Sequence, residues 1–320
     1  MVTLSSDTNA HAGARTVHQA SALTRRITTL SVSAALGLVA IKFAAWFASG
    51  SVALLASLAD SGLDVVASVA TFAAVRWAAE PPDREHRFGH GKAEAFASLL
   101  QAGLVFASAA LVGQEAVRHL IKPQPITAEG WAMGVMAIST LVTVLLVRAQ
   151  ARVLHQVQSI AVAGDRAHYL VDIAANLSAF AGIGLSLWLG SPIWDSVAGL
   201  IVAAWLVWGA IQVFRDSSSQ LLDHELPDAD RAEIMARMTS DPRVKGVHQL
   251  RTRASGPYIH IQMHADLEPS LSLEQAHEVV IAAENRVLEA FPAADIIIHQ
   301  DPQDRAQAHG GAFAEKEHHG

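Results

Sequence analysis

The sequence predicts an α-helical membrane protein with six transmembrane helices, followed by a C-terminal α+β domain of two layers. Three observations support this prediction. Long apolar stretches occupy most of residues 27–214. Charged residues make up 17% of the chain, below the share of about 25% that is typical of soluble domains. From residue 215 onward, the mixture of charged and apolar residues becomes that of an ordinary soluble protein.

The apolar part contains six stretches, each long enough to cross a bilayer, which takes about 20 helical residues. The stretches are 27–48, 52–78, 94–118, 130–150, 160–189 and 193–214. Short segments rich in Gly, Pro and Ser separate them, and these residues interrupt helices. Six such runs argue against the alternative, a buried helical core in a soluble protein. We expect a disordered tail at 1–24, the transmembrane domain at 25–215, the soluble domain at 216–302 and a disordered tail at 303–320.

The distribution of Lys and Arg predicts which side of the membrane each loop faces, because cytoplasmic loops carry an excess of both. If the helices alternate in direction, most of these residues lie on one side: Arg15, Arg25, Arg26, Arg76, Arg84, Arg87, Lys92, Arg148, Arg152, Arg166 and Arg215. The other side has Arg118 and Lys122. Both termini and the soluble domain are therefore expected in the cytoplasm.

The soluble part reads as a small α-β-β-α-β domain. Residues 228–240 have a helical pattern, and 244–253 and 258–267 have strand patterns separated by a Ser-Gly-Pro hairpin signal. A second helix runs from Ser272 to about residue 290, and a last strand follows at 294–299. This order predicts a two-layer sandwich.

Composition excludes several functions. The chain has no cysteine, which excludes disulfides, thiolate metal ligands, iron–sulfur clusters and cysteine nucleophiles. Its net charge is −7, and without a basic patch nucleic acid is not an expected partner.

Two pairs of polar residues lie where lipid is expected, and charged groups at that depth mostly serve a transport pathway. Asp60 and Asp64 are four residues apart in the second stretch, as are His168 and Asp172 in the fifth. This spacing puts each pair on one helical face, and a rise of about 1.5 Å per residue puts both pairs near the midplane. Three carboxylates and one imidazole suit zinc, and they also accept cadmium, ferrous iron or manganese. The alternative is that these residues cap, kink or hydrogen-bond the helices.

The loop after the second stretch contains a further cluster, Asp83, His86 and His90. The alternative for this cluster is a solvated loop with adventitious metal affinity. Its His-Arg-Phe-Gly-His segment is not the His-Glu-x-x-His of a metallopeptidase, and His277 also lacks a second histidine at that distance. No enzyme is therefore predicted.

These segments resemble the cation diffusion facilitator family, in particular its bacterial zinc/iron efflux branch. The matching sequences are Leu-Ala-Asp-Ser-Gly-Leu-Asp at 58–64, Asp-Arg-Glu-His-Arg-Phe-Gly-His-Gly-Lys-Ala-Glu at 83–94, His-Tyr-Leu-Val-Asp at 168–172, Leu-Asp-His-Glu-Leu-Pro at 222–227 and Ile-His-Gln-Asp-Pro at 298–302. The resemblance extends from about residue 25 to 302, nearly the whole chain.

The resemblance implies a homodimeric antiporter in a bacterial inner membrane that exports divalent cations, Zn²⁺ above all and also Cd²⁺ or Fe²⁺, in exchange for protons by alternating access. The family's transport site maps onto Asp60, Asp64, His168 and Asp172. In the family, Asp at the first of these positions is associated with lower selectivity among metals. Proton exchange agrees with the chemistry, because metal binding requires deprotonated carboxylates and neutral imidazole.

The resemblance implies roles for further residues. It places a weaker metal site at Asp83, His86 and His90, and a charge interlock between Lys92 and Asp223. It also implies a binuclear zinc site across the dimer interface, formed by His248, His264, His277, His299, Gln300 and Asp301. From the sequence pattern alone, these histidines would be ordinary surface or core residues. His260 receives no role.

Three alternatives remain at this stage. A manganese or ferrous-iron exporter would use the same transport site. A membrane-anchored metal sensor or scaffold would use the histidines of the soluble domain and would not need the intramembrane carboxylates. A channel would conduct metal without proton coupling.

Overall fold

The computed structural model describes residues 5–49, 52–122, 130–189 and 193–304. The chain divides into two compact units. One runs from Ala20 to Leu221, and the other contains the residues from Leu222 onward together with those up to Gln19.

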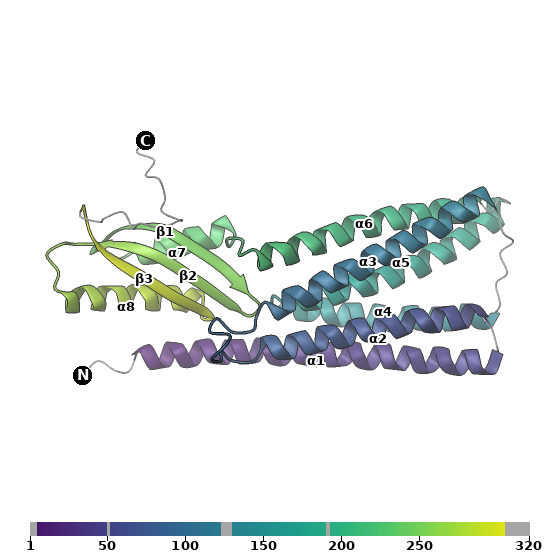
Figure 1. The fold of residues 1–320 in the computed structure, drawn as a ribbon, viewed down its shortest axis with the longest axis horizontal. Helices are drawn as coiled ribbons and strands as arrows, with labels where there is room; N and C mark the ends of the chain where they lie inside the picture. The colour runs from purple at the N-terminus through teal and green to yellow at the C-terminus, as the bar shows by residue number, and fades with distance from the viewer. Residues whose placement is uncertain (1–4, 50–51, 123–129, 190–192, 305–320) are drawn as a thin grey trace. The chain divides into compact units, whose positions relative to one another are not determined.

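Six long helices form the first part of the chain (Figure 1). They are α1 (Ser5–Ser49), α2 (Val52–Ala78), α3 (Ala93–Ile121), α4 (Gly130–Leu154), α5 (Ile160–Leu189) and α6 (Ile193–Leu221). All six predicted stretches are helical. The structure differs from the predicted disordered tail at 1–24, because α1 begins at Ser5. Residues 5–24 contain several alanines and no proline, and the single Gly13 is tolerated in a helix that continues into the apolar run.

The outer surface of this unit is apolar, as expected of a surface that contacts lipid. Phe47, Leu111 and Trp188 have exposed fractions of 79%, 67% and 81%, which would be unfavourable in water. Among the described residues, five helical segments are long and apolar enough to cross a membrane, one in each of α1, α2, α3, α4 and α6. The remaining helix, α5, is 30 residues long and carries charged residues in its first half.

Close helix packing positions α5 against α3. An added Cβ at Gly164 would lie 2.8 Å from Ser98 Oγ and 3.1 Å from Ser98 Cα. Glycine is therefore needed here, as small residues generally are where membrane helices approach closely. One turn further along α5, His168 occupies the same side of the helix.

Among its described residues from Leu222 to Asp304, the second unit forms a three-stranded sheet with two helices on one face. Its elements are α7 (Asp228–Met238), β1 (Val244–Ser255), β2 (Tyr258–Leu267), α8 (Leu273–Ala290) and β3 (Ala294–Pro302). The strand order is β1-β2-β3, with β1 antiparallel and β3 parallel to β2. Ile234 of α7 and Val287 of α8 pack with Ile261 and Met263 of β2 in one buried core. Because side chains alternate along a strand, His260 and His264 lie on the other face. The predicted fold class and element order are confirmed.

Candidate metal transport site

Three of the four predicted transport ligands meet between α2 and α5. The Nε2 atom of His168 lies 2.9 Å from Oδ1 of Asp64. Asp172, one turn along α5, completes a group whose ligand atoms all lie within 4.8 Å of one another. His168 and Asp64 are 4% and 5% exposed and Asp172 is half-buried, so the contact between His168 and Asp64 is shielded from bulk solvent within the unit. An imidazole and two carboxylates at this separation can bind one divalent cation.

The second ring nitrogen of His168 supports this interpretation. Its Nδ1 atom is buried and has no hydrogen-bond partner among the residues that the structure describes. Buried polar atoms are almost always paired, and an unpaired one calls for an explanation such as a bound ion or water. The cluster therefore has binding capacity that the described part of the chain does not use.

The fourth predicted ligand, Asp60, is not in this group. It lies one turn before Asp64 on α2, and its side chain is exposed. Its carboxylate interacts electrostatically with Asp64, His168 and Lys42. The i,i+4 spacing correctly places both aspartates near one helical face, but it does not determine which of the two contacts α5.

Lys42 of α1 is a residue that the sequence prediction missed. Its side chain is buried, and Nζ donates to Ser61 Oγ at 2.6 Å and to the backbone oxygen of Ser57 at 3.2 Å. Both acceptors belong to α2, on the turns that carry Asp60. The available signal was a lysine inside the apolar run 27–48, where a charge is unfavourable unless it serves a function.

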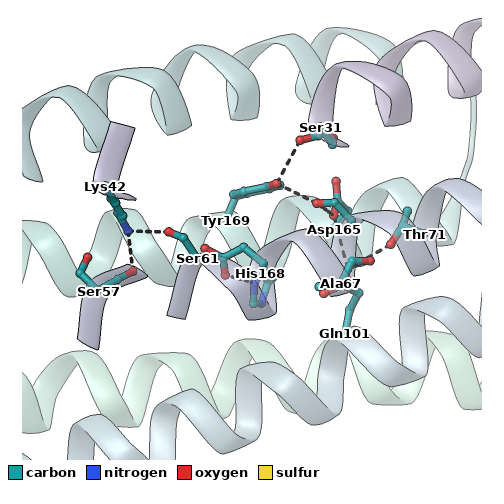
Figure 2. Close-up of polar contacts among 12 residues, drawn as sticks. Ser31, Lys42, Ser57, Ser61, Ala67, Thr71, Gln101, Asp165, His168 and Tyr169 are labelled. Atoms are coloured by element: carbon teal, nitrogen blue, oxygen red, sulfur yellow. Dashed lines mark hydrogen bonds and ion pairs between the residues drawn. The ribbon is translucent and has the colours of Figure 1, made fainter. Parts of the chain in front are cut away.

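Asp165 is the second missed residue, and it is fully buried one turn before His168. Gln150 Nε2 of α4 donates to its Oδ2 at 2.8 Å, while Ser68 Oγ of α2 and Gln101 Nε2 of α3 approach its Oδ1 at 3.3 and 3.4 Å. Tyr169 links this network to α1 through the backbone oxygen of Ser31. Figure 2 shows this network on one side of His168 and Lys42 on the other. The network around the Asp165 carboxylate thus connects the five helices from α1 to α5.

The predicted loop cluster forms in the segment between α2 and α3. Oδ2 of Asp83 lies 3.3 Å from Nε2 of His90, and its Oδ1 lies 3.3 Å from Nδ1 of His86. The three residues form a group of candidate ligands, two exposed and His90 buried. The backbone N–H of His86, and then that of Glu85, donate to Asp83 and lower the pKa of its carboxyl. The ring of Trp77 packs against both histidines.

In the second unit, strand register places histidines side by side. His248 of β1 is opposite His264 of β2, and His264 is beside His299 of β3. Asp301 joins them, because its Oδ2 lies 2.8 Å from His264 Nδ1 and 3.6 Å from His248 Nε2, and its Oδ1 lies 3.5 Å from His299 Nε2. The ligand atoms of His248, His264 and Asp301 form one candidate metal group. Asp266, which the sequence prediction missed, lies 3.6 Å from His248.

The other residues predicted for this site are not in that group. His277 is exposed on α8, and Gln300 is half-buried on β3 between two members of the cluster. His260, to which no role was assigned, contacts Asp295 at 3.3 Å.

The predicted charge interlock involves residues of different units, so the structure gives their contacts separately. Lys92 Nζ donates to the backbone oxygen of Leu221 at 3.2 Å, at the end of α6. Asp223 accepts a hydrogen bond from Arg253 at 3.1 Å. Their pairing stays a prediction.

Comparison with known proteins gives matches over nearly the whole chain. Residues 28–222 match the model of the cation efflux transmembrane domain, and residues 226–303 match that of the cytoplasmic domain of cation efflux proteins. The cation-efflux pump FieF of Salmonella arizonae is 40% identical over 280 residues, covering 88% of this chain and 93% of the pump. FieF of Salmonella typhimurium is 39% identical over 291 residues, covering 91% and 97%. A solved structure of CzrB in its zinc form aligns with 27% of this chain and 99% of its own at 29% identity, with a TM-score of 0.24.

The two family models divide the chain as the fold does, into a helical membrane part and a sheet-containing part. The relatives are cation efflux pumps, and nearly their full length is covered. The predicted family and the absence of an enzymatic function are therefore confirmed. The chain is a multi-pass cation efflux transporter of the cation diffusion facilitator family.

Proposed function

We propose that this protein exports a divalent metal cation, Zn²⁺ first among them, from the cytoplasm in exchange for protons. The observation that carries the proposal is the group of Asp64, His168 and Asp172, which lies inside the helical unit with its ligand atoms within 4.8 Å of one another. Asp60, one turn away, is the fourth ligand in this proposal and approaches the group when the ion binds.

The contact between Asp64 and His168 explains why metal and protons exchange. Without an ion, a proton between His168 Nε2 and the Asp64 carboxylate satisfies both atoms across their distance of 2.9 Å. A metal requires both atoms deprotonated, so its binding displaces that proton. Protons that enter from outside then release the ion. The same ligand atoms therefore bind either the metal ion or protons, and binding both at once is unfavourable.

The donor set supports zinc as the first candidate metal. Zinc is bound well by imidazole nitrogen with carboxylate oxygen in four-coordinate sites. Oxygen-rich sites also accept Mn²⁺ or Fe²⁺, so an exporter of these ions remains the second candidate, and Cd²⁺ remains a further cargo.

We further propose that the protein works as a homodimer in a bacterial inner membrane, with alternating access and both termini in the cytoplasm. The match of residues 226–303 to the cytoplasmic domain of cation efflux proteins supports this orientation. Zinc at the cluster of His248, His264 and Asp301 would stabilise the dimer, together with His277, His299 and Gln300, while Asp83, His86 and His90 would hold a weaker ion. The Lys92–Asp223 interlock belongs to this proposal.

Proteoliposomes with a trapped pH indicator test the proposed function. External Zn²⁺ should move protons in the opposite direction, and Asp64→Asn should abolish both fluxes. Asp228→Asn, which changes a fully exposed carboxylate on α7, is the matched control and should behave as the parent protein. Zinc flux without proton movement would indicate a channel. Unchanged antiport in Asp64→Asn would disprove the site, and the absence of any metal flux would favour a membrane-anchored sensor. Repeating the assay with Cd²⁺, Fe²⁺ and Mn²⁺ compares the rates at which these metals are transported.

A further inference from the structure

Lys42 is a buried cation beside the candidate transport site. Its side chain is 8% exposed, and the hydrogen-bond acceptors that the described residues offer it, Ser61 Oγ and the backbone oxygen of Ser57, are neutral. Neutral acceptors do not balance a buried charge. The opposite charges come from the site, since Asp60 and Asp172 both interact electrostatically with Lys42.

The serine contact fixes where this charge is held. Ser61 is fully buried and lies between Asp60 and Asp64 in the sequence of α2. A short hydrogen bond of 2.6 Å to Ser61 therefore holds the ammonium within about one helical turn of both carboxylates. Figure 2 shows Lys42 extending from α1 to these turns of α2, on the side of His168 opposite Asp165. Lys42 is close to the ligands without being one, because an ammonium has no lone pair to offer a metal.

The charges of the proposed site sum to zero only when Lys42 is included. Asp60, Asp64 and Asp172 contribute three negative charges when they bind metal, and neutral His168 contributes none. One divalent ion leaves a net charge of minus one, which the ammonium of Lys42 cancels. A net charge in a membrane interior is unfavourable, so a neutral loaded site changes conformation more easily than a charged one.

We propose that Lys42 is a fixed counter-charge of the transport site, which limits the affinity for the divalent ion and keeps the loaded site neutral. This inference rests on the proposed transport function. A nearby positive charge repels the bound cation, so it weakens binding and speeds release. Lys42 thus acts on the bound ion through its charge, and its removal should tighten metal binding. A purely structural role predicts the opposite, because loss of a buried contact would distort the site.

Equilibrium Zn²⁺ binding to the purified full-length protein tests this directly. The transport-site component is the difference between each protein and the same protein carrying Asp64→Ala. Lys42→Gln should lower the Kd of this component by at least about tenfold, given the repulsion between a unit charge and a nearby divalent ion in a site of low dielectric constant. Lys42→Arg keeps the charge and should bind as the parent protein does. Unchanged or weaker binding in Lys42→Gln, or tight binding in Lys42→Arg, would overturn the inference.

Ser61→Ala provides the matched control, because it removes the hydrogen bond but keeps the charge. Its affinity should stay near that of the parent protein. If Ser61→Ala binds Zn²⁺ as tightly as Lys42→Gln does, the hydrogen bond and not the charge controls the affinity, and the proposal is wrong. Lys42→Met fills the same space without a charge, so it serves as the second neutral variant if Lys42→Gln does not fold.

A transport measurement adds a readout that a structural defect does not produce. Zinc flux should depend more strongly on an imposed membrane potential in Lys42→Gln than in the parent protein, whereas Lys42→Arg should keep the potential dependence of the parent. Equal potential dependence in all variants contradicts the counter-charge. Failure of Asp64→Ala to remove any zinc binding or flux would instead contradict the proposed transport site, so the two failures are distinguishable.

Discussion

Gly164 allows a sharp test of how α5 is positioned. In Gly164→Ala, the new Cβ would lie 3.1 Å from the Cα of Ser98 and 3.3 Å from the Cβ of Gln101. The Ser98 hydroxyl, at 2.8 Å, can rotate away, but the backbone of α3 cannot. The two helices must therefore separate by a few tenths of an ångström, and such overpacking costs about 1–3 kcal/mol.

Helix propensity partly offsets this cost, since alanine is favoured over glycine inside a helix by about 1 kcal/mol. Gly103→Ala, also in a membrane helix, is the matched control because nothing lies within 4 Å of its new Cβ. We expect Gly103→Ala to raise the midpoint of thermal unfolding and Gly164→Ala to lower it. At about 2–4 °C per kcal/mol for a unit of this size, the two midpoints should differ by several degrees in detergent.

Zinc transport provides the second measurement for the same pair. Gly164 precedes His168 by one turn, so a shift of α5 moves an imidazole that must stay near Asp64. Small displacements of reacting groups are costly in precise sites, and Gly164→Ala should lose transport that Gly103→Ala retains. If both variants unfold at the same temperature and transport equally, the close approach of α3 and α5 does not position the site.

Three further predictions follow from buried or paired carboxylates. Asp165→Asn should destabilise the helical unit by about 1–3 kcal/mol, because the new amide N–H groups would face the N–H groups of Gln150 and its neighbours, which now donate to the carboxylate. Adding Gln150→Glu should restore an acceptor and recover part of the lost stability. Thermal unfolding in detergent measures both effects. Asp301→Ala should remove zinc binding by the histidine cluster, which zinc titration of the full chain measures against Asp295→Ala as control. Hydrogen bonds from Arg243 lower the pKa of Asp241 to about 2; because the folded-state pKa lies below the ordinary value of 3.8, the stabilisation is present above pH 4 and is lost as the pH falls toward 2. In acid unfolding, Asp241→Asn should remove this part of the pH dependence.

Much of the fold follows from patterns within short segments. Apolar runs bounded by Gly, Pro and Ser predicted α2 and α5 with the boundaries that the structure has. The hairpin signal predicted the turn between β1 and β2. The start of α1 differs from the prediction, because a polar segment without apolar periodicity predicts disorder, whereas its alanines and lack of proline allow a helix.

The site was predictable only in part, because its contacts join helices that are distant in sequence. Helical spacing identified Asp64 and His168, whose contact joins positions 104 residues apart. It did not show that Asp60 is exposed, since both aspartates satisfy the same spacing. Lys42 lies inside an apolar run and not near a helix end, so the distribution of Lys and Arg that predicts orientation does not point to it. The partners of Asp165 come from three helices besides α5, and no periodicity within α5 indicates them.

The histidine cluster is completed late in synthesis, because its ligands come from three strands that are translated one after another. His248 and His264 emerge from the ribosome on adjacent strands, but Asp301, the carboxylate that joins them, lies at the end of β3, the last strand. A nascent or truncated chain without β3 has the imidazoles and lacks the acid. If zinc binds this cluster as proposed, it would therefore mark a finished sheet, and its binding energy would stabilise the folded domain.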